Sequence, residues 1–122
     1  MMIERPILFE VDKAKFIPLN REAYHDFVKQ VGDKPLLVLI SAAWCPDCRN
    51  LYPLLDEALF GEFKDKFVVR YMNTDDNRGF ARELEVFSIP TIIVYRNAKE
   101  ISRIKADRMD YDSLAEYLEQ LL

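Results

Sequence analysis

The chain has 122 residues, of which 50% are hydrophobic and 31% charged, with a formal net charge of −4 and a pI of about 5.0. This length suits one domain with a core that needs no disulfide cross-links, so we expect a single domain over residues 1–122, with 1–15 as an N-terminal extension. The acidic balance argues against a nucleic-acid partner, and the absence of a run of ~18 apolar residues argues against a membrane span.

The N-terminal segment has the composition of a solvated chain and not that of a secretion signal, because charged residues interrupt any apolar run. These residues are Glu4, Arg5, Glu10, Asp12, Lys13 and Lys15. We therefore expect a cytoplasmic protein, and structural disulfides are rare in the cytoplasm. A pair of cysteines there is more often catalytic, redox-sensing or metal-binding.

The first half of the chain alternates strand and helix patterns. Residues 7–11 and 16–18 are candidate short strands. Asn20 predicts the N-cap of a helix whose apolar residues recur at helical spacing, and Gly32 is expected to close that helix. Five consecutive aliphatic residues over 36–40 predict a strand that is buried on both faces.

The alternation continues to the end of the chain. The predicted elements are a helix over 46–60, a strand over 67–72, a helix over 77–84, a strand over 86–95, a returning strand over 100–104 and a helix over 110–122. We expect Asp75 or Asp76 to cap the third helix of the chain. This order predicts an α/β fold with a central mixed β-sheet flanked by helices on both faces.

The chemistry is concentrated in Trp44-Cys45-Pro46-Asp47-Cys48, between a predicted buried strand and a helix. The two intervening residues allow both sulfur atoms to meet across the first helical turn. Cys45 would then be the N-cap, where free amide groups and the helix dipole favour a thiolate and lower the thiol pKa from about 8.5 by one or more units. Cys48, one turn further in, would resolve a mixed disulfide formed at Cys45.

From about residue 16 to 122 the chain resembles the thioredoxin family. The resemblance rests on several separate anchors, of which the last is the most telling: Trp44 before the first cysteine, Pro53 in the following helix, Asn73-Thr74-Asp75 after the next strand, and Ile89-Pro90-Thr91. A CxxC pair alone is a weak signal, but a proline-bearing strand at this distance makes it specific.

The resemblance implies a thioredoxin fold and a thiol–disulfide oxidoreductase, most simply a dithiol reductase using a redox-active Cys45–Cys48 disulfide, without cofactor or metal. It also implies a cis peptide bond before Pro90, substrate backbone bound at Ile89, and Trp44 on the substrate-binding surface. The implied partners are protein or small-molecule disulfides and an electron-donating reductase or thiol.

Several positions depart from the family pattern. The acidic residue that the family buries beneath the cysteines falls at Leu39, and its lysine partner falls at Tyr71. Asp47, or water, would then have to accept the proton of the resolving thiol, although a first-turn helix charge is the simpler interpretation of Asp47. Ser41 replaces a common aromatic residue. The Cys-Pro-Asp-Cys centre also occurs in related proteins of this size that prefer small disulfides.

Two alternatives remain open at this stage. Structural zinc needs about four ligands, whereas the chain offers two cysteines and His25 in a distant predicted helix. A thioredoxin-fold interaction module or redox sensor with little turnover is the second alternative, and the missing acid–lysine pair favours it. An oxidase or isomerase is less expected because the chain shows no export signal. Repeated turnover would separate an enzyme from a sensor.

Overall fold

The computed structural model describes residues 11–122, so most of the candidate strand at 7–11 lies outside the described residues. The elements in chain order are β1 (Ile17–Pro18), α1 (Arg21–Lys29), β2 (Leu36–Ser41), α2 (Pro46–Glu57), η1 (Ala58–Glu62), β3 (Val68–Asn73), α3 (Phe80–Glu83), β4 (Thr91–Arg96), β5 (Lys99–Lys105) and α4 (Tyr111–Gln120). The predicted order of strands and helices is confirmed.

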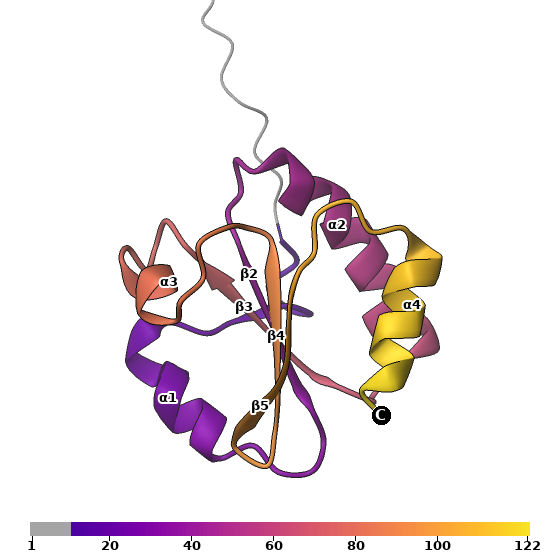
Figure 1. Ribbon diagram of the computed structural model, residues 1–122, viewed down its shortest axis with the longest axis horizontal. Helices are drawn as coiled ribbons and strands as arrows, with labels where there is room; N and C mark the ends of the chain where they lie inside the picture. The colour runs from indigo at the N-terminus through magenta and orange to yellow at the C-terminus, as the bar shows by residue number, and fades with distance from the viewer. Residues whose placement is uncertain (1–10) are drawn as a thin grey trace, which may run out of the picture.

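The strands form one mixed sheet in the order β1-β3-β2-β4-β5. β1, β3 and β2 are parallel to one another, whereas β4 is antiparallel to both β2 and β5. Helices α2 and α4 cover one face of the sheet, and α1 and α3 lie on the other (Figure 1). The predicted α/β architecture is therefore confirmed. No helix within residues 11–122 is long and apolar enough to cross a bilayer.

The central strand β2 is buried along its whole length, as its aliphatic sequence predicts for a strand covered on both faces. Leu37 and Leu39 pack beneath α2 and α4, whereas Val38 and Ile40 pack against α1 and α3. Successive side chains of a strand point to opposite faces. Ser41, two residues beyond Leu39, therefore lies on the face that α2 covers.

Two predicted helix boundaries are wrong. Helix α1 begins after the N-cap Asn20, as predicted, but ends at Lys29, and its C-cap Gln30 keeps a right-handed conformation. Gly32 therefore lies beyond the helix and does not close it. Helix α3 begins only at Phe80, after Gly79, whose φ of 81° is available to glycine without a steric cost.

Two further boundaries differ from the sequence prediction. Strand β4 begins at Thr91, so the segment from residue 86 to Pro90 is a loop and not part of the strand. This agrees with the missing N–H of proline, which cannot donate a ladder hydrogen bond. The predicted helix over 46–60 is divided into α2 and the π-helical turn η1, where the Phe63 amide donates to the Ala58 carbonyl at 2.8 Å.

The hairpin between β4 and β5 gives a test of backbone strain. Its two turn residues, Asn97 and Ala98, have φ values of 52° and 65°. Such turns favour Asn-Gly, because a Cβ is crowded in the left-handed region. We expect Ala98→Gly to raise the free energy of unfolding by about 1 kcal/mol in urea denaturation. Ala115→Gly, the same change inside α4, should lower it by about 1 kcal/mol. A loss in both variants would contradict this account.

Candidate active site

The two cysteines lie at the start of α2, just beyond the carboxyl end of β2. Cys45 is the N-cap residue: its amide donates to the Ala42 carbonyl at 3.2 Å, and its sulfur accepts a hydrogen bond from the Cys48 amide at 3.2 Å. Pro46 occupies the first helical turn, where a missing N–H leaves no hydrogen bond unmade. Both cysteines are free thiols. The predicted capping position of Cys45 is confirmed.

The environment of Cys48 disfavours its thiolate. Its side chain is buried, and burial followed by the hydrogen bond with Cys45 raises its pKa to about 12. The Ala42 backbone and the Ser41 hydroxyl act in the opposite direction. At neutral pH the Cys48 thiol is therefore almost entirely protonated. Because the thiolate is the attacking species, the proton of Cys48 must be removed for Cys48 to attack.

The loop before β4 lies against the first cysteine. The Ile89–Pro90 peptide bond is cis, and Pro90 is buried. The Cys45 thiol donates to the Ile89 carbonyl over a sulfur–oxygen distance of 3.9 Å. Ile89 also packs against the small apolar cluster of Ala42, Cys45 and Cys48. The fold therefore brings together two motifs that lie 44 residues apart in the sequence.

Trp44 lies at the surface beside the cysteines, with 52% of the residue exposed. Its indole N–H donates to a carboxylate oxygen of Asp75 at 3.2 Å. The Asp75 amide in turn donates to the Asn73 side chain at 2.8 Å, which fixes the turn after β3. Asp75 is thus a partner of Trp44 and not a helix cap, and Asp76 does not cap α3 either, because that helix has no side-chain cap.

The contact between Trp44 and Asp75 could have been predicted from the order of the strands. β2 and β3 are parallel neighbours, with Ser41 paired to Asn73 at their carboxyl ends. Residues that follow two such strands emerge at the same edge of the sheet. A polar residue soon after β3, such as Asp75, is therefore carried toward Trp44 in the loop after β2.

Asp47 lies in the first turn of α2 and is exposed. It lines a pocket of about 260 Å³ together with Asn50, Arg108 and Met109. Its role as a proton acceptor stays a prediction.

The structure keeps the histidine away from the cysteines. His25 is exposed on α1, and its ring packs edge-on against Tyr24 and Phe80, on the face of the sheet opposite to α2. Across residues 11–122, no group of three or more His, Cys, Asp or Glu side chains could hold a metal ion.

The burial of Cys48 leads to a prediction about reactivity. Brief alkylation of the reduced protein with iodoacetamide at neutral pH should label Cys45 at least about a hundredfold faster than Cys48, because so little of Cys48 is thiolate. Fragmentation of the labelled peptide by mass spectrometry assigns the modified residue. Equal labelling, or a preference for Cys48, would reject the assignment of Cys45 as the more reactive thiol.

Comparison with known proteins identifies the relatives of this chain. The family model described as Thioredoxin matches residues 15–120. A chloroplastic M-type thioredoxin of Chlamydomonas reinhardtii is 41% identical over 94 residues, which cover 77% of this chain and 66% of the relative. A thioredoxin of Rickettsia felis is 40% identical over 83 residues, 66% of this chain and 78% of the relative. The bifunctional thioredoxin reductase/thioredoxin of Mycobacterium leprae is 36% identical over 73 residues, 60% of this chain and 16% of the relative.

Proposed function

The chain belongs to the thioredoxin family, a family of thiol–disulfide oxidoreductases, and we propose that it works as a dithiol reductase through Cys45 and Cys48. The observation that carries this proposal is the capping cysteine whose sulfur contacts both the Cys48 amide and the Ile89 carbonyl. Cys45 lies at the N-terminus of α2, and Cys48 lies one helical turn further along, close enough to attack the Cys45 sulfur.

In the proposed cycle, the Cys45 thiolate attacks one sulfur of a substrate disulfide and displaces the other as a thiolate. The Cys48 thiolate then attacks the Cys45 sulfur, which forms the Cys45–Cys48 disulfide and releases the second substrate thiolate. The protein dithiol is thereby oxidised and the substrate disulfide reduced by the same two electrons. An external donor must then reduce the protein disulfide before the next turnover.

The proposed substrate-binding residues are Trp44, Ile89 and Pro90. The Ile89 carbonyl beside the Cys45 sulfur is a backbone acceptor that an extended substrate segment could use. Trp44 offers an exposed aromatic surface next to it, tethered by Asp75. Protein or small-molecule disulfides would both fit such an open site.

The proposed electron donor is a reductase or a small thiol. The Mycobacterium leprae relative supports a reductase, since its name joins a thioredoxin reductase and a thioredoxin in one protein. We also propose the cytoplasm as the place of action. Both cysteines of the chain stand at the one site, which leaves none for the structural cross-links that are typical of oxidising compartments.

A turnover assay tests the proposal against the redox-sensor alternative. Catalytic amounts of the protein should reduce many equivalents of insulin or cystine when dithiothreitol supplies electrons. A matched Cys45→Ser variant should give only the uncatalysed rate. Consumption of a single equivalent per chain, followed by arrest, would identify a sensor and reject the enzyme. The ratio of insulin to cystine rates then separates protein from small-molecule substrates.

A further inference from the structure

The hydroxyl of Ser41, at the end of β2, is fully buried and has no hydrogen-bond partner within the described part of the chain. The Ser41 backbone is ordinary, since its carbonyl accepts from the Thr74 amide at 3.0 Å. A buried polar group without a partner destabilises the folded state, and such groups are rare in native proteins. A smaller apolar residue would avoid this cost, so the hydroxyl calls for a functional explanation.

Ser41 and Tyr71 lie two register positions apart on neighbouring strands, on the face of the sheet covered by α2, the helix that carries Cys48. Burial raises the pKa of both Cys48 and Tyr71, and the Ser41 hydroxyl acts against burial at each of them. These directions agree with the placement of Ser41 on the same face as both side chains, although its hydroxyl makes no hydrogen bond of standard geometry with either of them. Negative charge on Cys48, Asp75 or Asp76 raises the pKa of Tyr71 further, and Tyr71 and Asp76 line the same pocket.

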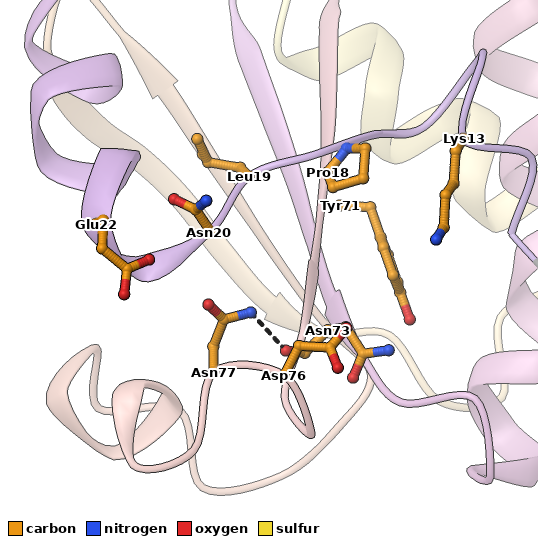
Figure 2. A pocket seen from close by; sticks show the side chains of 9 residues that line it. All are labelled: Lys13, Pro18, Leu19, Asn20, Glu22, Tyr71, Asn73, Asp76 and Asn77. Atoms are coloured by element: carbon orange, nitrogen blue, oxygen red, sulfur yellow. Dashed lines mark hydrogen bonds between the residues drawn. The ribbon is translucent and has the colours of Figure 1, made fainter.

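Tyr71 connects this buried group to a polar opening. Its side chain lines a pocket of about 360 Å³ together with Lys13, Asn73 and Asp76. Figure 2 shows the ring running along the pocket, with the hydroxyl toward the end of β3 that carries Asn73. The residue opposite Tyr71 in β2 is Leu39, whose buried aliphatic side chain cannot accept a proton.

We propose that Ser41 and Tyr71 form a hydroxyl relay that carries the proton of Cys48 to the pocket during resolution of the mixed disulfide. As the Cys48 thiol gives its proton to the Ser41 oxygen, Ser41 passes its own proton to Tyr71. Tyr71 then passes its proton to water or to the Asp75 or Asp76 carboxylate. Neither hydroxyl gains or loses a proton overall.

The relay rests on the proposed function, because it serves the second step of that cycle. The Cys48 sulfur attacks the Cys45 sulfur as its proton leaves. The bond between Cys45 and the substrate sulfur breaks, and that sulfur departs with the bonding electron pair and takes a proton from water. Cys45 on α2 and Ser41 on β2 act on the pKa of Cys48, whereas the pKa of Tyr71 on β3 responds to charge on Cys48 and on the two aspartates after β3.

The two steps can be timed separately with one equivalent of 5,5′-dithiobis(2-nitrobenzoate). The first thionitrobenzoate released reports attack by Cys45, and the second reports resolution by Cys48. Ser41→Ala and Tyr71→Phe should each slow the second release near neutral pH by about tenfold or more, since a positioned proton-transfer group is lost. The first release should be unchanged. At alkaline pH the second release should converge with that of the wild type, because hydroxide removes the proton directly.

Two controls distinguish a relay from a structural effect. The double variant should be no slower than the slower single variant, because both hydroxyls belong to one path. Ser102 and Tyr117 form a second hydroxyl pair, at 2.6 Å between β5 and α4. Ser102→Ala and Tyr117→Phe should therefore leave both releases unchanged. The urea midpoint of Ser41→Ala should be equal to or above that of the wild type, since the lost hydroxyl had no partner.

An unchanged second release at every pH in folded Ser41→Ala or Tyr71→Phe would overturn the relay and leave the proposed function intact. An effect of Asp47→Asn with none of Ser41→Ala would assign the proton to Asp47 and also overturn it. A wild-type protein that gives no first release would overturn the proposed function itself.

Discussion

Replacement of Cys48 by serine is expected to stop the catalytic cycle halfway and to leave the substrate attached to Cys45. Cys45 keeps its position at the helix N-terminus and still attacks, but no second thiol can displace the substrate. We expect turnover to fall by about a hundredfold or more, as for loss of a group that acts directly in covalent catalysis. Intact-mass spectrometry should show a stoichiometric adduct that dithiothreitol removes.

Cys45→Ser is the matched control for this trap. The remaining Cys48 thiol is buried, and burial is the largest cause of its raised pKa, so it should form no adduct under the same conditions. An adduct on Cys45→Ser together with none on Cys48→Ser would reverse the assigned roles. When exposed to cell extract, the Cys48→Ser protein should also capture its disulfide substrates, which fragmentation can then identify.

Leu39→Asp is expected to be the most destabilising substitution in this account. Leu39 is 1% exposed and is paired with Tyr71 and Ile92 in the two neighbouring strands. Neither neighbour offers the positive charge that would offset a buried carboxylate. We expect a loss of about 3 kcal/mol or more in the free energy of unfolding at neutral pH. Urea denaturation measures this loss directly.

The loss in Leu39→Asp should depend on pH in a defined direction. Desolvation raises the pKa of the new carboxyl in the folded protein above its unfolded value of about 3.9. Below that value the carboxyl is neutral in both states and the loss is smallest. As pH rises, the unfolded chain ionises first, so stability falls by up to about 1.4 kcal/mol per pH unit until the folded carboxyl also ionises.

Leu39→Asn provides the control, because it buries a polar group of the same shape that does not titrate. Its stability difference from the wild type should not change with pH. Leu39→Asp following the same flat profile would show that the carboxyl reaches water and would contradict the buried environment. A double variant that carries both Leu39→Asp and Ser41→Ala addresses the proton transfer. If it folds, its new carboxylate should restore the rate of the second thionitrobenzoate release that Ser41→Ala lowers.

The regular elements could be predicted from the sequence because their patterns are local. The aliphatic run of β2, the cap at Asn20 and the order of strands and helices each depend on residues that are close in the chain. The placement of the CxxC motif could also be predicted, since the N-cap position of Cys45 follows from its place before Pro46. The architecture followed from the order of these elements.

What the sequence did not reveal depends on contacts between distant segments. The bond from Trp44 to Asp75 arises only when parallel β2 and β3 end at the same edge, and composition alone favoured a helix cap for Asp75. Ser41 was visible as a departure from the family, but its burial without a partner needs coordinates. The predicted start of α3 is too early, because the turn through Gly79 separates the helix from its predicted caps, Asp75 and Asp76.

The central claim is that Cys45 and Cys48 cycle between a dithiol and an intramolecular disulfide while a substrate disulfide is reduced. Its most direct test is intact-mass spectrometry of the reduced wild-type protein after reaction with one equivalent of cystine. The account predicts a protein lighter by a pair of hydrogen atoms, cysteine as the product, and full recovery of the original mass with dithiothreitol. A persistent protein–cysteine adduct, or an unchanged protein, would contradict it.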